Sequence, residues 1–599
     1  MSADIPGVDP FARSSTTKER TVSASAEAAL VVSVVYLAWR AGVTLGGADF
    51  LAASLLLGAE ALSVVVFAAR VRSARHEPIE VVASPGAPQP DVAAVVDATG
   101  TSIDELRTTL VALRRVAGVD RTIVVDREGS RWLRTVAERL DATVVERSVS
   151  FDEAVVSSGY SWVLLMRSGD LPMPDLVSVS AARCSSPDVA IIQVGIEEAD
   201  PTSFEHDPNG HWSLEPFEQQ VVRPGLAAQG SIPWFGDGPT LVRRSAVSAL
   251  DSVGVGHMLD NSRRIGLDVI RSGMTVTHLP LTLARVRGPQ GLGESLVRRH
   301  RRASQALRAL RRNDLRGIPR SAKVAHYLAV VPMIAAIQRV LLIASAILVL
   351  AFDQLPMRAE LLYVALLAVP SYLLRWNTHV LLGRGRLGLF SILRSDLRSL
   401  GVDLLPFGKV RPEASRAGLS AVVVVVVALH AAVIVTALAM WRDWPNRLPV
   451  AVAATALALT AGFLGIAMEV LLDAIARRQR RANHRVRLGL VTCRIEELDG
   501  QLVDLSTGGA GVVVAGTPDG TLAVGDVTTV AFRIPDADGA WKSVSALVHV
   551  AHRSPDPDGG TRLGLSFDDP TDAPLDPVVE FLTIDRRLVA LGRHEAVHG

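Results

Sequence analysis

Six long apolar segments, with hardly a charge among them, determine most of what this chain can fold into. A helix of about 20 apolar residues crosses the roughly 30 Å hydrocarbon core of a bilayer. The segments that meet this requirement are 28–45, 50–69, 327–352, 359–376, 419–440 and 448–472. They predict an integral membrane protein with pairs of transmembrane helices at 26–75, 327–377 and 417–476. Gln338 and Arg339 interrupt the third segment, which leaves open whether its first half crosses the membrane or lies along its surface.

The placement of arginine predicts which side of the membrane each region faces, because basic residues favour the cytosolic side. Arg-rich stretches follow the second, fourth and sixth segments and precede the third, whereas the loop 46–49 has no basic residue. Both termini are therefore expected in the cytosol, with residues 1–25 as a disordered N-terminal segment. The net charge is only +1, so no overall field attracts nucleic acid, and none is expected as a partner.

The region 79–320 is expected to be a soluble α/β domain. Short apolar runs alternate with amphipathic stretches, a pattern typical of a mostly parallel sheet covered by helices on both faces. The predicted strands are 92–96, 122–125, 142–145, 162–166 and 189–194, and the predicted helices are 104–116 and 130–140.

Two further regions follow the fourth apolar segment. Leucines and arginines alternate over 380–410, which predicts an amphipathic helix at the inner membrane surface; a helix packed between domains is the alternative. The region 477–588 has β-type runs, Gly and Asp turns and no long helix until its end, which predicts a small β-barrel. The two cysteines lie far apart without metal-ligand spacing, so no metal site is expected from them.

Two arginines and a turn motif mark this C-terminal region. Arg481 and Arg485 precede the run DLSTGG, which contains Asp504, Ser506 and Gly509. A guanidinium pairs with phosphate or a guanine edge and stacks on purines, and a carboxylate accepts guanine N–H groups. Each motif alone has a simpler explanation, an anchor at the inner membrane surface or a common turn. Together they resemble the RxxxR and [D/N]xSxxG motifs of the PilZ domain, which implies that these five residues bind cyclic di-GMP as a regulatory ligand.

The order of the regions resembles the catalytic subunit of bacterial cellulose synthase. That family joins a GT-A glycosyltransferase of family 2 to membrane helices and a PilZ domain. The runs 235–244, 261–280 and 295–310 resemble its Gly-rich turn, the segment after its TED motif and its QxxRW helix. The resemblance implies a location in the bacterial inner membrane. For an active member it also implies a nucleotide sugar, a polysaccharide product, Mg²⁺ and other synthase subunits as partners.

The nucleotide and metal motifs of that family are altered here. Asp126 lies where the family holds the uridine. The two carboxylate positions of the DxD motif are occupied by Arg167 and Gly169, which leaves Asp170 as the remaining acid. The resemblance therefore marks Asp126 and Asp170 as candidates for nucleotide-sugar binding, and their alternative role is that of loop or cap acids. Arg167 puts a positive charge where the cation belongs, or else pairs with phosphate directly.

The acceptor-side motifs are altered as well. The TED motif falls on 260–262, so that Ser262 takes the place of the base and Asp260 is a displaced substitute. The QxxRW motif falls on 298–302, where its arginine is kept as Arg301 and its tryptophan is lost. Asp260 and Arg301 are therefore the candidate catalytic residues, and a loop acid is the alternative for Asp260.

Two functions follow from these patterns. The altered motifs favour a membrane receptor for cyclic di-GMP with a degenerate transferase domain that regulates exopolysaccharide or envelope synthesis. The architecture and Asp126 favour an active processive glycosyltransferase that cyclic di-GMP activates. A plain anchor or transporter leaves the α/β region without a role. In either case the ligand is expected to move the barrel against the α/β domain.

Overall fold

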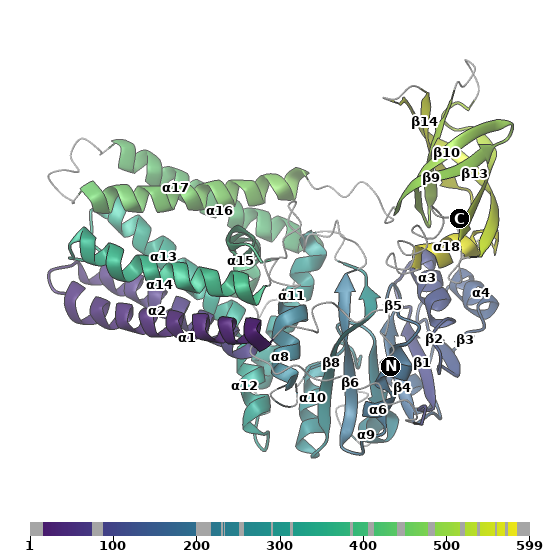
Figure 1. Cartoon of the computed structure of the whole chain (residues 1–599), viewed down its shortest axis with the longest axis horizontal. Coiled ribbons are helices and arrows are strands. Elements are labelled where there is room, and N and C mark those ends of the chain that lie inside the picture. Colours follow the sequence, from purple (N-terminus) through teal and green to yellow (C-terminus); the bar gives the residue numbers. More distant parts are fainter. Residues whose placement is uncertain are drawn as a thin grey trace.

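The computed structural model has three parts, a helical bundle, an α/β domain and a β-barrel (Figure 1). It describes residues 16–74, 88–198, 217–228, 230, 232, 234–248, 250, 257–288, 292–311, 315–383, 387–404, 412–439, 450–476, 486–515, 522–535, 540–556, 560–569 and 573–583. The bundle and the barrel both contact the α/β domain, which lies between them.

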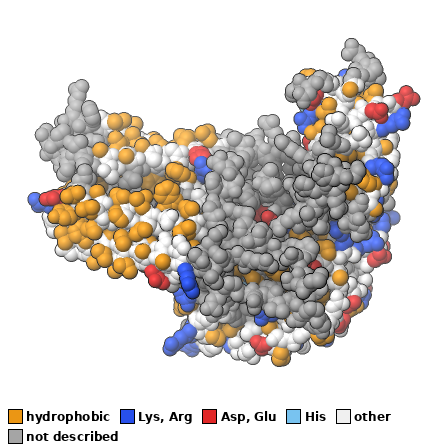
Figure 2. Space-filling model, in the orientation of Figure 1, with side chains coloured by type: hydrophobic (Ala, Val, Ile, Leu, Met, Phe, Trp, Pro, Cys, Tyr) orange, Lys and Arg blue, Asp and Glu red, His pale blue; other side chains and the backbone are white. Residues whose placement is uncertain are grey.

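The bundle contains the predicted apolar segments as long helices. They are α1 (Thr16–Trp39), which continues as the π-helix η1 (Arg40–Thr44), α2 (Phe50–Ala74), α13 (Val331–Phe352), α14 (Leu361–Leu382), α16 (Pro412–Ala439) and α17 (Val450–Ala476). Among the described residues, four helices are long and apolar enough to cross a membrane: 20–44, 50–74, 331–352 and 454–472. Hydrophobic side chains cover the visible face of this bundle (Figure 2). The crossings at 359–376 and 419–440 remain predictions.

One helix begins earlier than expected, and another continues through two polar residues. The helix α1 begins at Thr16, so residues 16–25, expected to be disordered, are helical; the segment has no Gly or Pro, and Lys18, Glu19, Arg20 and Ala24 favour a helix. The helix α13 runs unbroken through Gln338 and Arg339. Arg339 is accommodated because its guanidinium donates to Asp396 at 2.9 Å, and Gln338 is buried.

The α/β domain is built on an eight-stranded sheet in the order β3-β2-β1-β4-β7-β6-β8-β5. Its strands are β1 (Val92–Asp97), β2 (Arg121–Val125), β3 (Thr143–Val144), β4 (Trp162–Arg167), β5 (Leu171–Pro172), β6 (Val189–Glu198), β7 (Thr240–Arg243) and β8 (Thr275–Val286). The pairing is parallel except that β7 runs antiparallel to β4 and β6, and β5 to β8. The predicted strands and the predicted α/β class, with a mostly parallel sheet, are therefore confirmed.

Helices cover both faces of this sheet because its central strands are apolar on both sides. One face packs against α3 (Ile103–Leu113), α4 (Arg131–Arg139) and α6 (Leu176–Cys184). The other packs against α5 (Phe151–Val156), α9 (Arg244–Ser248), α10 (Ser262–Arg271) and α12 (Arg320–Leu328). Because β1 pairs in parallel with both β2 and β4, the carboxyl ends of these three strands lie along one edge of the sheet.

Two helices join the α/β domain to the bundle. The helix α11 (Leu292–Arg311) follows β8, and α15 (Leu389–Leu404) lies in the predicted amphipathic region. Arg299 of α11 pairs with Asp403 of α15 at 2.8 Å, and Arg70 of α2 lies 3.8 Å from Asp396 of α15. The acids of α15 thus face inward, and the helix packs between the domain and the bundle.

The C-terminal region is a closed six-stranded barrel, as predicted. Its order is β10-β11-β14-β13-β12-β9, and every described pairing is antiparallel. The strands are β9 (Val486–Ile495), β10 (Leu498–Ser506), β11 (Gly509–Val514), β12 (Val527–Pro535), β13 (Trp541–Pro555) and β14 (Thr561–Phe567). The helix α18 (Asp576–Thr583) closes the region and reaches the α/β domain, where Val579 joins the core beside α3.

Candidate functional site

The first part of the site is the sheet edge where β1, β2 and β4 end. Ligands of open α/β sheets bind outside the carboxyl ends of parallel strands. Asp97 ends β1, Asp126 follows β2 and Arg167 ends β4, so one acid or base projects from each strand end. The predicted residues Asp126, Arg167 and Asp170 therefore do lie in one neighbourhood.

Asp126 shapes the loop that leads into α4. Its carboxylate accepts the backbone N–H of Glu128 at 3.0 Å and that of Ser130 at 2.7 Å, and the residue is buried. Ser130 in turn caps α4 by accepting from Leu133 N–H. Both oxygens of Asp126 are thus engaged with backbone, which favours its alternative role as a loop acid.

Asp97 is a site residue that sequence reasoning missed, although it directly follows a predicted strand. Its carboxylate lies 2.9 Å from His257 Nε2 and accepts the N–H of Thr99 at 3.1 Å. The His257 ring stacks on Phe151 with centroids 4.6 Å apart. Burial raises the pKa of Asp97, but the hydrogen bond and charge of His257 outweigh it and hold the pKa below its ordinary value.

The Asp170 side chain is buried in the α/β domain. Its carboxylate accepts the backbone N–H of Arg167 at 2.9 Å across a turn in which Gly169 has φ +94°. Burial raises the pKa of Asp170 to about 6, in spite of the hydrogen bond and charge of Arg167. This environment suits a structural carboxyl better than a ligand to a solvated cation.

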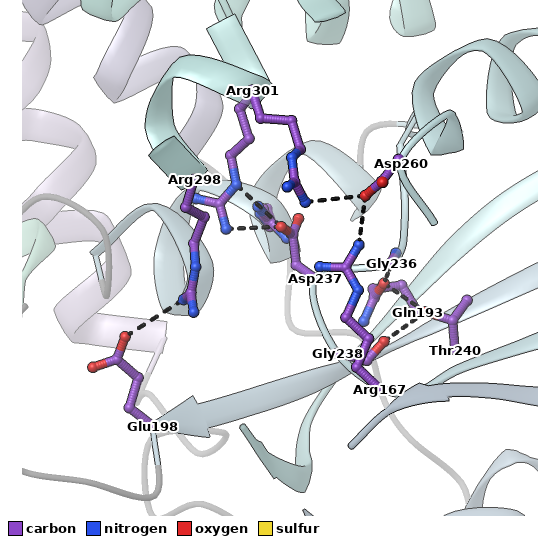
Figure 3. A network of polar contacts seen from close by, with 12 residues as sticks. Arg167, Gln193, Glu198, Gly236, Asp237, Gly238, Thr240, Asp260, Arg298 and Arg301 are labelled. Atoms are coloured by element: carbon purple, nitrogen blue, oxygen red, sulfur yellow. Dashed lines mark hydrogen bonds and ion pairs between the residues drawn. The ribbon is translucent and has the colours of Figure 1, made fainter. Parts of the chain in front are cut away.

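The two candidate catalytic residues meet at the same edge. Asp260 Oδ1 accepts from Arg301 Nη1 of α11 at 3.0 Å and from Arg167 Nη2 at 2.8 Å (Figure 3). The amide of Gln305 also donates to the backbone oxygen of Asp260. Asp260 is therefore held between two guanidinium groups, as a bridge between β4 and α11.

A second bridge, not predicted from the sequence, lies beside the first. Asp237, in the predicted Gly-rich turn, pairs with Arg302 of α11 at 2.7 Å and with Arg223 at 2.6 Å. Gln193 fixes this turn, because its Oε1 accepts from Gly236 N–H at 2.8 Å and from the Thr240 hydroxyl at 2.9 Å. Gln193 holds the shape of the turn, and the Asp237–Arg302 ion pair holds the turn against α11 (Figure 3).

These residues do not fit a divalent cation. The resemblance assigns the two metal-binding carboxylate positions to Arg167 and Gly169, and Arg167 and Arg301 bring two positive charges to Asp260, which lies between them. No group of three or more His, Cys, Asp or Glu that could hold a metal exists within the described part of the chain. Divalent cations require several oxygen ligands, which this arrangement does not present.

The barrel carries the second part of the site. Asp504 lies buried on β10, with Arg562 Nη2 of β14 at 3.5 Å from its carboxylate. The Ser506 hydroxyl donates to the carbonyl of Gly509 across the turn between β10 and β11. A Cβ on Gly509 would lie 2.1 Å from the carbonyl oxygen of Leu565, so only glycine fits there. Arg481 and Arg485 lie outside the described residues.

Arg562 is the barrel residue that sequence reasoning missed, although it lies within the predicted barrel. It is half-exposed beside Asp504, so a guanidinium and a carboxylate lie together on neighbouring parts of the barrel. Ser506 and Gly509 act on the backbone of the turn, and Asp504 and Arg562 form a polar pair beside it.

A comparison with protein families identifies the C-terminal region. The model of the PilZ domain family matches residues 477–583, so this region is a PilZ domain. No match was found among curated proteins. Of the solved structures, mannosyltransferase PcManGT from Pyrobaculum calidifontis has 15% identity over 59% of this chain and 99% of its own, with a TM-score of 0.40.

Two further solved structures are similar to separate parts of the chain. Glucosyl-3-phosphoglycerate synthase from Mycobacterium tuberculosis has 17% identity over 41% of this chain and 87% of its own, with a TM-score of 0.28. The PilZ domain of YcgR from Escherichia coli, solved with c-di-GMP, has 21% identity over 20% of this chain and 98% of its own, with a TM-score of 0.15.

Proposed function

We propose that this protein is a membrane-bound receptor for cyclic di-GMP whose α/β domain is a transferase domain of the cellulose synthase type that has lost metal-dependent transfer. The single observation that carries the proposal is the bridge Arg167–Asp260–Arg301, because Arg167 takes a position that the resemblance gives to a metal-binding carboxylate and two guanidinium groups engage Asp260, the substitute for the base. The receptor would regulate exopolysaccharide or envelope synthesis from the bacterial inner membrane, with both soluble domains in the cytosol.

Recognition of cyclic di-GMP would use the PilZ domain. Asp504 offers its carboxylate to guanine N–H groups, and Arg562 beside it offers a guanidinium to phosphate or to a guanine edge. Arg481 and Arg485 precede β9 and would add two more guanidinium groups, while Ser506 and Gly509 hold the turn beneath the ligand.

The contact between α18 and the α/β domain provides a route from ligand to membrane. Arg107 of α3 is almost fully buried, and its Nε donates to Asp576 of α18 at 2.9 Å. Val579 packs into the core next to it. Movement of the barrel on ligand binding would act directly on α3, and α11 would carry it to the bundle.

A second function, an active processive glycosyltransferase that uses a nucleotide sugar, has one observation in its favour. Asp97, Asp126 and Arg167 still line the carboxyl edge of the sheet, and Arg167 offers a guanidinium to phosphate in place of a metal. Release of the nucleotide from UDP-glucose by purified protein, measured with and without Mg²⁺, would establish this function and overturn the first.

Titration of cyclic di-GMP into wild-type protein and Arg485→Ala tests the receptor. The loss of charge-assisted hydrogen bonds, worth about 1.5–3 kcal/mol, should weaken binding at least about tenfold. Arg533→Ala is the matched control, because Arg533 is an exposed arginine on β12. Equal affinity in all three proteins would refute the assignment of the ligand to the RxxxR motif.

A further inference from the structure

A cavity of about 140 Å³ lies where the α/β domain meets the bundle. Its wall combines the cytosolic end of α2, the beginning of α13, the Gly-rich turn and α11. Arg70 and Ser73 of α2 stand on one side, and Val331 and Pro332, where α13 enters the membrane region, stand on another. The cavity therefore opens at the level where lipid headgroups meet the protein.

The wall is strongly basic. The described residues that line it include three carboxylates and eight arginines, which are Arg70, Arg167, Arg223, Arg263, Arg298, Arg299, Arg301 and Arg302. Among the described residues, Asp396, Asp260 and Glu198 also reach these arginines from outside the lining, which makes eight arginines to six carboxylates in this set. The N-terminus of α13 adds a positive partial charge to the same space. This excess of positive charge favours an anion in the cavity.

Arg263 is a buried cation in this wall, and its hydrogen bonds are incomplete among the described residues. It is only 6% exposed, and its guanidinium lies 4.9 Å from the ring centre of Trp234. Its Nη1 contacts His326 Nδ1 at 3.3 Å, but its buried Nε has no hydrogen-bond partner among the described residues. Burial lowers the pKa of Arg263 to about 10, so the group is still charged at neutral pH. A buried cation with an unused donor is costly unless an anion completes it.

The size and the apolar part of the wall narrow the choice of anion. A cavity of this volume accommodates a phosphate group. Leu226, Phe235, Leu259 and Leu328 form the apolar side. Basic pockets between membrane helices on the cytosolic side bind anionic lipid headgroups, and this wall has the matching chemistry for a headgroup phosphate with the start of its acyl chains.

We propose that this cavity binds the phosphate of an anionic membrane lipid, with Arg263 as its central donor and Arg298 as a second, more exposed donor. A bound headgroup would tie α10, α11 and α13 together at the membrane surface. The site is separate from the PilZ domain and does not depend on cyclic di-GMP.

Binding of a short-chain lipid to the full-length protein in neutral detergent tests the proposal. Dihexanoyl phosphatidylglycerol is titrated against wild type, Arg263→Gln, Arg298→Gln and the control Arg320→Gln, an exposed arginine at the start of α12 that does not line the cavity. We expect Arg263→Gln to weaken binding about tenfold or more, Arg298→Gln to weaken it severalfold, and Arg320→Gln to leave it unchanged. Thermal unfolding of each variant confirms that it is folded.

Parallel titrations separate the possible sources of the phosphate. Dihexanoyl phosphatidylcholine, which carries no net charge, should bind at least about tenfold more weakly than phosphatidylglycerol. Glycerol 3-phosphate and inorganic phosphate should bind more weakly still, because they lack the acyl chains. Binding of these soluble phosphates as tight as that of the lipid would overturn the assignment to a lipid. Unchanged lipid affinity in folded Arg298→Gln and Arg263→Gln would overturn the site itself, and if Arg263→Gln does not fold, Arg298→Gln alone decides.

Discussion

Replacement of Asp576 by Asn should detach the PilZ domain from the α/β domain. Asp576 begins α18, and its carboxylate accepts from Arg107 Nε at 2.9 Å and from Arg139 Nη2 at 3.3 Å. Hydrogen bonds to charged groups contribute about 1.5–3 kcal/mol. The Asp576 side chain is 33% exposed, so solvent screening places the expected loss near the lower end, at about 1.5 kcal/mol. A loss of that size lowers the ratio of docked to undocked barrel about tenfold.

Hydrogen exchange measured by mass spectrometry on the full-length protein follows this change. Amides of α18 should exchange about tenfold faster in Asp576→Asn if undocking controls their opening, and peptides of α3 should lose protection with them. Glu580→Gln is the matched control, because Glu580 lies on the same helix but pairs with Lys542 of the barrel at 3.2 Å. Unchanged exchange at both helices in Asp576→Asn would refute the view that this ion pair holds the two domains together.

Three further changes test individual features. Because burial raises the pKa of Asp170 to about 6 from about 3.9 in the unfolded chain, stability should fall as the pH rises from about 4 to about 6. Asp170→Asn should therefore stabilise the protein by about 1–3 kcal/mol at pH 7.5 and by nothing below pH 4 in thermal unfolding; a pH-independent difference would contradict this. Gly511→Ala puts a Cβ 2.7 Å from the Asp504 carboxylate and should weaken cyclic di-GMP binding about tenfold, whereas Gly462→Ala, with open space around it, should not. Asp260→Asn should change stability by less than about 1 kcal/mol, because its ion pairs are exposed, and a larger loss would show a more buried role.

The helices and strands could be predicted well, because the hydrophobic periodicity that marks them depends only on residues close together in the sequence. The runs 92–96 and 162–166 became β1 and β4 with almost the same limits. The early start of α1 at Thr16 was missed because polar helix formers extend the helix beyond its apolar part. The sequence also left the environment of Arg339 open, because its partner Asp396 lies far along the chain on α15.

Residues of the site could be predicted only where they fall on a recognised sequence motif. The QxxRW and TED positions led to Arg301 and Asp260, which do meet, but no sequence signal joins Asp237 to Arg302 and Arg223, or Asp97 to His257. These pairs form because the sheet brings distant loops to one edge, and only the tertiary structure determines which charges face each other. The same holds for Arg107 and Asp576, which lie in different domains.

The central claim is that the protein binds cyclic di-GMP and has lost metal-dependent use of a nucleotide sugar. Calorimetric titration of the full-length protein in detergent, first with cyclic di-GMP and then with UDP-glucose and Mg²⁺, tests both halves in one sample. The predicted result is heat of binding for cyclic di-GMP, lost in Arg485→Ala, and none for UDP-glucose. Absence of binding by cyclic di-GMP, or Mg²⁺-dependent binding of UDP-glucose, would contradict the account.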